Sequence, residues 1–519
     1  MKRFASQLGL VVLSGVLLSA AFPPLDLGFV AWFALVPLLL AFERARRRGA
    51  VWWIYLHSVV FFTMGLWWMT VVAAAGLAVT VFHLGFFQMV FAVPVFAARH
   101  RLRLPYLAVA PVAWVAAEFF RSFALTGYAW LYVGHTQWRF LELIQIADFA
   151  GAFGVSFLVV AVNAALLDAC LLRNPRAKAA AIAVPAILLA GALTYGGHRL
   201  GEAEFRDGPR VAIVQGNIPQ SVKVQAVKMS TQDVMDRHLE LTLEAMAGAE
   251  TPDLVVWAET MVPGYLNADV RFLTQAADLA RRHRTRLLLG SNAYDQLADG
   301  GYRKANSVFH VGEDGRLRDR YDKTHLVPVG EYNPYRDLLP RTNEVIYQTA
   351  GFLPDLEDGE GAMNGELESG GTKYRFEPVI CYELIFPELV RSYAAEDADF
   401  LILLTNDAWW ADSFEYEQFL AISVFRAIEN RVALVRCGNT GISGFIDPSG
   451  RIDDDDLLTR DGKTKNVPGV LVRRVRIDDR KSLYLALGDV FAKACLVAVI
   501  VVAFVALLRG TKGAPRVSG

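Results

Sequence analysis

Long apolar runs without charged residues fill the first part of the chain and recur once near its end. Runs of this kind are long enough to cross a lipid bilayer as helices. Residues 49–98 contain no Asp, Glu, Lys or Arg, which predicts two spans joined by a tight turn. The pattern as a whole predicts eight membrane spans, at roughly 8–22, 27–42, 51–73, 75–98, 104–120, 151–172, 179–196 and 486–508.

Basic residues cluster at alternate ends of the predicted spans, and this asymmetry sets the expected orientation. By the positive-inside rule, the loops that carry the clusters face the cytoplasm. Both termini are therefore expected in the cytoplasm, and the polar stretch between about 199 and 485 is expected on the outer side. The first run follows two basic residues, as in a signal peptide, but further runs follow at once, which favours an uncleaved span. The clustered residues are Lys2, Arg3, Arg44, Arg46, Arg47, Arg48, Arg99, Arg101, Arg103, Arg173, Arg176, Lys178, Arg509, Lys512 and Arg516.

A polar segment interrupts the apolar pattern after the fifth predicted span. Glu118 and Arg121 end that span, and Gln145, Asp148 and Asn163 follow. Charges inside a membrane are costly, so they raise a functional hypothesis. Residues three apart on a helix can also simply pair with each other. The sequence leaves both interpretations open.

The pattern changes from about residue 209, where short β-rich runs alternate with amphipathic helical stretches. This alternation predicts an α/β layered domain whose reactive groups lie at the carboxyl ends of strands. Two acidic or glycine-rich stretches, 355–371 and 453–456, are expected to be surface excursions without chemistry. The predicted strands are 210–214, 254–257, 286–289, 307–311, 379–380, 400–404, 434–436 and 444–446, and the predicted helices are 232–247, 270–282 and 414–430.

Composition agrees with a membrane part joined to a water-facing part, because 54% of the residues are hydrophobic and 20% are charged. A net charge of −1 gives no reason to propose nucleic acid as a partner. There is no HExxH, paired CxxC, GxGxxG or P-loop motif, so neither a metal nor a cofactor is predicted. Of the four cysteines, Cys170 and Cys495 lie in apolar segments, and Cys381 and Cys437 lie in the polar part.

Three predicted strand ends in the polar part carry reactive side chains. Glu259 follows an apolar strand, Lys323 stands in the segment YDKTH, and Cys381 follows the strand FEPVI at a sharp corner. A thiol, a carboxylate base and a cation are the minimum for acyl transfer through a thioester. A second carboxylate, Glu331 or Glu383, is expected to support the lysine or the incoming amine, and His325 is an alternative base.

Glu…Lys…Cys in this order, each at the end of an apolar strand, resembles the nitrilase superfamily. The supporting phrases are WAET (257–260), DKTHLVPVGEYNP (322–334), VICYELIFPELVR (379–391), LTNDAWWADS (404–413), FRAIENR (425–431) and GNTGISGFIDPSGRI (438–452). Together with the predicted spans, with VQGNIPQS (214–221) and with the segment at 117–137, they resemble the apolipoprotein N-acyltransferase family. The family usually has Pro at the position of Ala258 and a Trp near Val224, and these departures put a Trp-based lid at Val224 in doubt.

The resemblance implies a multi-pass α-helical membrane bundle that carries an αββα nitrilase-like sandwich. It implies that Cys381 is the acylated nucleophile, Glu259 the general base and Lys323 the oxyanion-stabilising group, with Glu331, Glu383 and Tyr382 in support. The implied domains are a membrane domain (1–198), a periplasmic catalytic domain (199–485), a last span (486–508) and a cytoplasmic tail (509–519).

The implied reaction is ping-pong. A phospholipid donates its acyl chain to Cys381, and the α-amino group of the S-diacylglyceryl-cysteine of an apolipoprotein accepts it. The implied location is the bacterial inner membrane, and a monomer without a cofactor is expected. An alternative from a different reaction class is a membrane-tethered amidase, because the same thioester can react with water instead of an amine.

Overall fold

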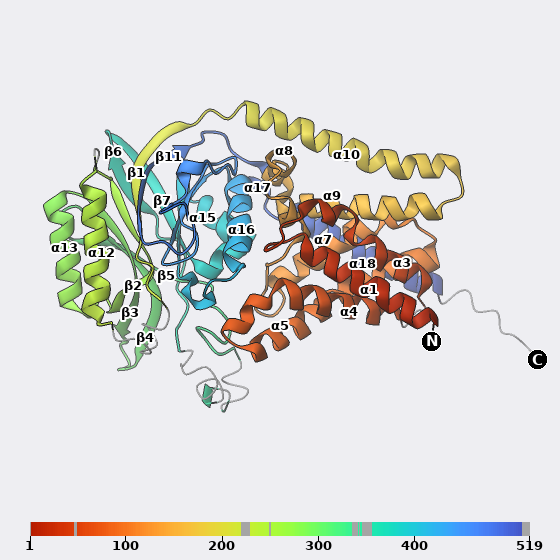
Figure 1. The fold of residues 1–519 in the computed structure, drawn as a ribbon, viewed down its shortest axis with the longest axis horizontal. Helices are drawn as coiled ribbons and strands as arrows, with labels where there is room; N and C mark the ends of the chain where they lie inside the picture. The colour runs from red at the N-terminus through yellow and green to blue at the C-terminus, as the bar shows by residue number, and fades with distance from the viewer. Residues whose placement is uncertain are drawn as a thin grey trace, which may run out of the picture. The chain divides into compact units, whose positions relative to one another are not determined.

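The computed structural model describes residues 2–45, 49–219, 229–248, 251–334, 341, 343–344 and 355–510. The chain divides into two compact units, one formed by Met1–Glu202 with Ala486–Gly519 and the other by Ala203–Leu485. The first is called the helical unit and the second the sandwich unit (Figure 1).

The helical unit is built from apolar helices, several of them interrupted by short 3-10 turns. Among the residues that the structure describes, four helical stretches are long and apolar enough to cross a membrane: Ala74–Leu102, Ala147–Leu171, Pro175–Gly201 and Val490–Arg509. Its helices are α1 (Lys2–Ala20), α2 (Ala31–Ala34), α3 (Val36–Arg44), α4 (Gly49–Gly65), α5 (Ala74–Phe87), α6 (Met89–Ala97), α7 (Ala110–Phe123), α8 (Leu141–Ile144), α9 (Ala147–Leu171), α10 (Pro175–Gly201) and α18 (Val490–Gly510).

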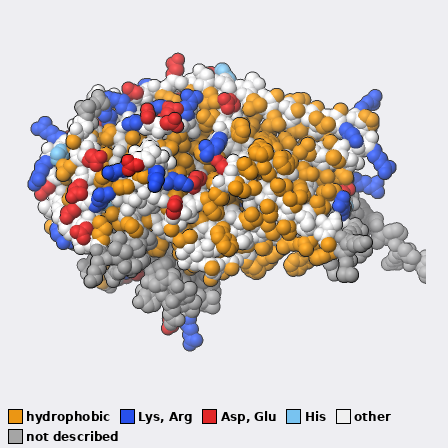
Figure 2. Space-filling model, in the orientation of Figure 1, with side chains coloured by type: hydrophobic (Ala, Val, Ile, Leu, Met, Phe, Trp, Pro, Cys, Tyr) orange, Lys and Arg blue, Asp and Glu red, His pale blue; other side chains and the backbone are white. Residues whose placement is uncertain are grey.

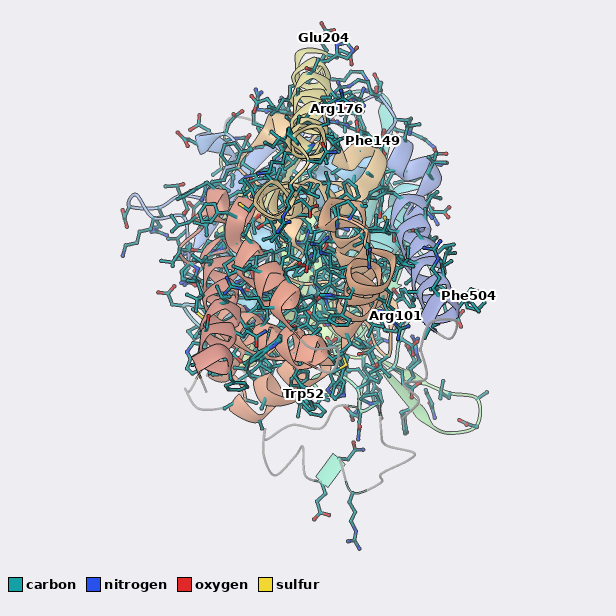
Figure 3. All side chains as sticks on the ribbon, turned by 90° about the vertical axis from the view of Figure 1, so that its right-hand side faces the viewer. Trp52, Arg101, Phe149, Arg176, Glu204 and Phe504 are labelled. Atoms are coloured by element: carbon teal, nitrogen blue, oxygen red, sulfur yellow. The ribbon has the colours of Figure 1, made fainter. Side chains whose placement is uncertain are left out.

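Hydrophobic side chains cover much of the surface of this unit, as Figure 2 shows. Trp52 is 69% exposed and Phe504 is 60% exposed, and Figure 3 shows both at the outside of the helices. A water-soluble surface rarely exposes so many large apolar groups together, whereas lipid tails accommodate them. The exposed surface and the four long helices are those of a membrane protein, and the count of eight spans stays a prediction.

The two buried charges of the polar segment are bound by neighbouring backbone and an indole. The Glu118 carboxylate accepts hydrogen bonds from Trp114 Nε1 (2.9 Å) and from the backbone N–H of Val133 (2.7 Å). The Arg121 guanidinium donates to the carbonyl oxygen of Tyr128 (2.9 Å). Both side chains therefore connect α7 to the segment that follows it. These hydrogen bonds run to backbone and an indole, not between the two charges, so the pairing of Glu118 with Arg121 stays a prediction.

The sandwich unit contains two β-sheets. The six-stranded sheet has the order β11-β1-β2-β3-β4-β5, and the five-stranded sheet has the order β10-β9-β8-β7-β6. The strands are β1 (Arg206–Gln215), β2 (Leu254–Tyr265), β3 (Arg286–Gln296), β4 (Tyr302–Val311), β5 (Leu317–Asp322), β6 (Gly365–Ser369), β7 (Thr372–Ile380), β8 (Phe400–Thr405), β9 (Ala433–Gly438), β10 (Gly444–Ile446) and β11 (Gly469–Ile477).

Helices cover the outer face of each sheet, and the inner faces pack on each other through β1, β2, β8 and β9. Figure 1 shows α12 and α13 on one side of the sheets and α15 and α16 on the other. The predicted layered α/β domain is confirmed. Its helices are α12 (Thr231–Met246), α13 (Val270–His283), α15 (Pro387–Ala394) and α16 (Glu415–Asn430), and α17 (Leu483–Leu487) precedes α18.

Parallel pairing brings several strand ends to one edge of the unit. β2 pairs in parallel with β1 and β3, and β8 pairs in parallel with β7 and β9. β8, with the sequence FLILLT, is buried along its whole length, as a strand covered on both faces must be. The carboxyl ends of β7 and β8 carry residues of the candidate site. Glu259 lies in the middle of β2, just after the pairing of β2 with β1 ends at Trp257.

Residues 355–371 are mostly exposed or half-buried, as expected of a surface segment, but part of the segment is a strand. Gly365–Ser369 forms β6, which pairs antiparallel with β7 at the edge of the five-stranded sheet. Residues 355–364 form backbone hydrogen bonds to the segments that carry Lys323 and Glu331. The pairing is local, because Ser369 pairs with Thr372 across the turn Gly370-Gly371. Two glycines between strands are a hairpin signal, and the prediction of a loop overlooked it.

Candidate active site

Cys381 lies at the point where β7 ends and a short 3-10 turn, Cys381–Ile385, begins. Its φ angle is +48°, a left-handed conformation that costs free energy for any residue with a Cβ. The side chain is only partly buried. A strained corner directly after a buried strand holds a nucleophile rigidly while leaving its sulfur open to a substrate.

Glu259 and Lys323 come from the other sheet and contact each other. Glu259 lies on β2, where a register irregularity against β3 falls between Trp257 and Val262. Lys323 directly follows β5, and its Nζ lies 3.5 Å from Glu259 Oε1. The lysine side chain is only 1% exposed, so its charge acts in a medium that screens it weakly.

A second carboxylate, that of Glu331, also contacts this charge. Glu331 Oε2 lies 2.9 Å from Lys323 Nζ. The same Glu331 oxygen accepts the backbone N–H of Val327 at 2.8 Å. Burial by itself lowers the pKa of Lys323, but the charges of Glu331 and Glu259 outweigh it and raise the pKa above its usual value. Lys323 is therefore a permanent cation, suited to stabilising an oxyanion and unable to act as a base.

For the thiol of Cys381, burial and not the neighbouring charges has the larger effect on the pKa. Its desolvated position raises the pKa well above the usual value, and the charge of Glu259 raises it further. The charge of Lys323 opposes this but does not overcome it. The resting thiol is therefore protonated, and a base must remove its proton before it can attack.

Glu383 has a different surrounding from Glu331. It is fully buried, and its carboxylate accepts hydrogen bonds from the backbone N–H of Ile380 (2.7 Å), the hydroxyl of Tyr321 (2.6 Å) and the backbone N–H of Thr324 (2.7 Å). Burial raises its pKa. Glu383 thus joins the end of the cysteine strand to the segment that follows Lys323.

Tyr382, His325 and Phe386 form an aromatic group. Tyr382 directly precedes Glu383 in the chain. The His325 ring lies 4.0 Å from the Phe386 ring and 5.9 Å from the Tyr382 ring, measured between centroids. Burial raises the pKa of Tyr382. These ring contacts give His325 a packing role, whereas Glu259 contacts the catalytic candidate Lys323 directly, which favours Glu259 as the base.

Comparison with known proteins gives the family of the chain. Residues 14–165 match the apolipoprotein N-acyltransferase N-terminal domain, and residues 210–454 match the carbon-nitrogen hydrolase family. The chain is 35% identical to the apolipoprotein N-acyltransferase of Geobacter metallireducens, with 96% of this chain and 95% of that protein covered. The chain belongs to the apolipoprotein N-acyltransferase family.

Other relatives extend the comparison. The chain is 29% identical to the apolipoprotein N-acyltransferase of Chlorobaculum tepidum, with 96% of each protein covered. Among solved structures, an amidase from Nesterenkonia sp. is similar at 20% identity and a TM-score of 0.37, with 54% of this chain and 93% of that chain covered. The carbon-nitrogen hydrolase match identifies the sandwich unit as a nitrilase-like α/β domain.

The sequence departs from the family at Ala258 and near Val224, and the structure describes only the first of these positions. Ala258 is fully buried on β2 and leaves Glu259 in contact with Lys323, so the missing Pro does not displace the carboxylate. Val224 lies outside the described residues.

Two asparagines of the site were missed by the sequence analysis. Asn306 on β4 donates from Nδ2 to Glu259 Oε1 (2.7 Å) and to Glu331 Oε1 (3.0 Å), so it bridges both carboxylates. The backbone N–H of Asn406, directly after β8, donates to Glu259 Oε2 (2.8 Å). The strand-end rule could have found Asn406, but nothing in the sequence singles out Asn306 within its antiparallel strand.

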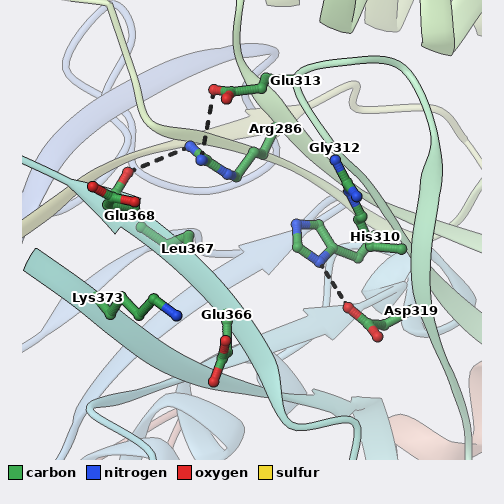
Figure 4. Close-up of a pocket in the computed structure, with 10 residues that line it drawn as sticks. Arg286, His310, Gly312, Glu313, Asp319, Glu366, Leu367, Glu368 and Lys373 are labelled. Carbon is green, nitrogen blue, oxygen red and sulfur yellow. Dashed lines mark hydrogen bonds and ion pairs between the residues drawn. The ribbon is translucent and has the colours of Figure 1, made fainter. Parts of the chain in front are cut away.

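A separate pocket of about 560 Å³ lies at the amino ends of the parallel strands, where Arg286 begins β3 (Figure 4). Its charged groups are partly matched to each other. Arg286 lies 3.5 Å from Glu313, and His310 lies 3.3 Å from Asp319. Glu259 does not line this pocket, because it lies farther along β2, past the residues that pair with β1. Within the described ranges, no group of three or more His, Cys, Asp or Glu side chains could hold a metal ion.

Proposed function

We propose that this protein is a phospholipid:apolipoprotein N-acyltransferase that works through a thioester on Cys381. The observation that carries the proposal is the buried Glu259–Lys323–Glu331 cluster in a chain of this family. The charges of Glu259 and Lys323 act on the Cys381 thiol. The acyl donor is a phospholipid, and the acceptor is the α-amino group of an S-diacylglyceryl-cysteine.

The first half-reaction forms the thioester. Glu259 takes the proton of the Cys381 thiol, and the sulfur attacks the carbonyl carbon of an acyl ester in the phospholipid. Lys323 stabilises the negative charge that develops on the carbonyl oxygen. The ester C–O bond then breaks, and the lysophospholipid leaves as an alcohol with the proton that Glu259 returns.

The second half-reaction transfers the acyl chain to nitrogen. The neutral α-amino group attacks the thioester carbonyl, and Glu259 takes a proton from the nitrogen as the amide bond forms. The C–S bond breaks, and the thiolate of Cys381 recovers the proton. Glu331 holds Lys323 in place through both steps, and Glu383 and Tyr382 shape the surrounding of the thiol.

The proposal includes a membrane topology. The helical unit would anchor the enzyme in the bacterial inner membrane, with residues 199–485 as a periplasmic catalytic domain and both termini in the cytoplasm. In this topology the membrane domain is residues 1–198, the last span is residues 486–508, and the cytoplasmic tail is residues 509–519. The positive-inside distribution of Lys and Arg supports this orientation, and we propose that the enzyme acts as a monomer.

Intact-mass measurement of the purified protein tests the proposal. After incubation with phospholipid in detergent micelles, the wild type should gain the mass of one acyl chain, and hydroxylamine should remove it. Cys381→Ala should gain nothing. Cys170→Ala is the matched control, because Cys170 is an exposed thiol in the helical unit and its loss should leave the adduct unchanged.

The acceptor decides between transfer and hydrolysis. A diacylglyceryl-cysteine peptide should discharge the adduct much faster than water does, with the acyl chain recovered as an amide. Discharge by water alone, together with turnover of small amides, would identify the membrane-tethered amidase instead. A wild-type protein that forms no adduct with any phospholipid would refute acyl transfer at its first step.

A further inference from the structure

Residues 355–364, here called the strap, form hydrogen bonds to the main chain of Lys323, which carries the proposed catalytic charge, and of Glu331, which pairs with it. The backbone N–H of Gly359 donates to the carbonyl oxygen of Lys323 at 2.8 Å. The backbone N–H of Leu356 donates to the carbonyl oxygen of Glu331 at 3.0 Å. The strap therefore fixes the backbone at both partners of the Lys323–Glu331 ion pair.

The beginning of the strap is fastened to β4 as well. Lys304 Nζ lies 2.6 Å from the Asp355 carboxylate, and the backbone N–H of Glu357 donates to the carbonyl oxygen of Lys304 at 2.8 Å. Arg303 donates to the carbonyl oxygen of Asp358 at 2.9 Å. These contacts tie the strap to the six-stranded sheet.

The other end of the strap is fastened to the strand that delivers the cysteine. The backbone N–H groups of Met363 and Asn364 donate to the two carboxylate oxygens of Glu377, at 2.9 and 2.7 Å. Glu377 lies on β7, four positions before Cys381 in the chain, and is only 2% exposed. The strap thus joins the sheet that carries Lys323 to the sheet that carries Cys381.

Close packing at Gly359 keeps the strap against the lysine segment. A Cβ built on Gly359 would lie 2.6 Å from the Cβ of Asp322, the residue before Lys323, and would also collide with its carbonyl oxygen. Only glycine allows the strap to approach this closely.

We propose that Glu377 and the strap are positioning elements, which hold Lys323 and Glu331 at the correct distance from Cys381 for acyl transfer. The inference rests on the proposed function. Neither element touches the reacting atoms, so each acts through the backbone to which it is bonded. A displacement of about 1 Å at a catalytic group is enough to slow a reaction strongly.

The Glu377 carboxyl group, here called the anchor of the strap, changes its charge near neutral pH. Burial raises the pKa of Glu377 to about 7, the two backbone N–H donors oppose the rise, and the charge of Glu396 adds to it. The Tyr393 hydroxyl on α15 is the other titratable group coupled to Glu377. Ionised Glu377 offers an acceptor to both N–H groups, whereas protonated Glu377 turns one oxygen into a donor. The anchor is therefore complete only above neutral pH.

The rate of thioester formation on Cys381 in the full-length protein tests the inference. The donor is a mixture of phosphatidylethanolamine and phosphatidylglycerol in detergent micelles, at saturating concentration. Glu377→Gln keeps the size of the side chain but removes its charge and one acceptor. It should slow acylation about tenfold at pH 8 and less than about twofold at pH 6, because the wild-type anchor is already incomplete at the lower pH.

Glu368→Gln is the matched control, because Glu368 has an exposed side chain on the neighbouring strand β6. It should retain the wild-type rate at both pH values. A merely structural role for Glu377 would lower the amount of folded protein without changing the pH profile of the folded fraction.

Gly359→Ala tests the strap independently of any charge. It should slow acylation about tenfold at every pH, with unchanged half-saturation by phospholipid, since the strap acts on positioning and not on lipid binding. Gly248→Ala is its control, because a Cβ at Gly248 meets only ordinary contact, 3.4 Å from the Ala245 carbonyl oxygen. Wild-type rates in both Glu377→Gln and Gly359→Ala would overturn the inference and leave the proposed function intact. A wild-type protein that forms no thioester would overturn both.

Discussion

Single side chains around Lys323 divide the work between charge and geometry. Glu259 and Glu331 both contact the ammonium group, but only Glu259 also adds to the electrostatic field at the thiol of Cys381. The side-chain amide of Asn306 donates a hydrogen bond to each of the two carboxylates and so fixes their positions relative to each other. The result is a fixed cation and a carboxylate, both of which act electrostatically on a protonated thiol. In the proposed reaction that carboxylate is the base that nucleophilic acyl transfer requires.

Glu259→Gln should reduce the rate of thioester formation by roughly 10²–10⁴-fold, because it removes the general base while preserving side-chain shape. The measurement is single-turnover acylation of Cys381 by phospholipid, followed by intact mass. Glu240→Gln on α12, at an exposed position, is the control and should react at the wild-type rate. A Glu259→Gln rate within about threefold of wild type would assign the base to another residue, with His325 as the next candidate.

Glu377 also makes stability depend on pH. In the unfolded chain its pKa is near 4.5, and in the fold it is about 7, so between these values the folded state holds the extra proton. Its contribution to stability is therefore largest at low pH and is lost as the pH rises through this window, by up to about 3 kcal/mol.

Glu377→Gln should remove this loss. The thermal unfolding midpoint of the variant, relative to wild type in the same detergent, should rise between pH 5 and pH 8. A constant difference across this range would contradict the titration. The same variant is expected to be slower in acylation at pH 8, so its stability and its activity should move in opposite directions.

At the scale of secondary-structure elements, the sequence predicted those strands whose hydrophobic residues follow one another directly. The fully apolar β8 and the strand that ends at Cys381 could be recognised from their runs of hydrophobic residues before a polar group. The strap could not, because its backbone partners on β4 and the lysine segment lie far along the chain. β6 could have been recognised, since it forms a hairpin with β7 across Gly370-Gly371. Predicted span 27–42 became two short helices and a 3-10 turn, since hydropathy does not show where a helix is interrupted.

The candidate site followed the same division. Lys323 and Cys381 could be selected because each directly follows a strand, and Glu331 could be named as a supporting carboxylate. Glu259 was selected on the same expectation, but β2 continues past it to Tyr265. The different surrounding of Glu383 could not be predicted, because Tyr321 and Thr324 reach it only in the folded chain. Asn306 was missed for the same reason.

Glu383→Ala should damage the fold as well as the reaction. It leaves the N–H groups of Ile380 and Thr324 and the hydroxyl of Tyr321 without their buried acceptor. The expected loss of stability is more than about 3 kcal/mol, because each unsatisfied buried group costs on the order of 1–3 kcal/mol. Thermal unfolding in detergent measures it. A variant that is inactive but melts with the wild type would instead give Glu383 a direct part in the chemistry.

At the scale of the whole molecule, the chain combines a soluble type of catalytic fold with a lipid-exposed helical unit. A nitrilase-like domain in free solution would have little access to a phospholipid ester or to a lipid-anchored amino terminus. Joining it to membrane helices in the same chain confines it to the surface where both substrates lie. The side of the membrane on which the sandwich unit lies then decides which substrates it meets, and the distribution of Lys and Arg predicts the outer side.

Accessible cysteines in cells test this orientation. The background carries Cys170→Ser and Cys381→Ala, so that the remaining native thiols, Cys437 and Cys495, are buried. Lys481→Cys places a thiol at an exposed position of the sandwich unit, and Arg176→Cys places one at the exposed start of α10. A membrane-impermeant maleimide should label the first in intact spheroplasts and the second only after the membrane is permeabilised.

The paired design separates orientation from reactivity, because each position must be labelled under one of the two conditions. Labelling of Arg176→Cys in intact spheroplasts, with Lys481→Cys protected, would reverse the topology and place the candidate site in the cytoplasm. The apolipoprotein acceptor would then have to be cytoplasmic too, and the positive-inside rule would fail for five basic clusters at once. Labelling of both in intact spheroplasts would place the loop before α10 on the outer side and refute the predicted odd number of spans that separates it from the sandwich unit.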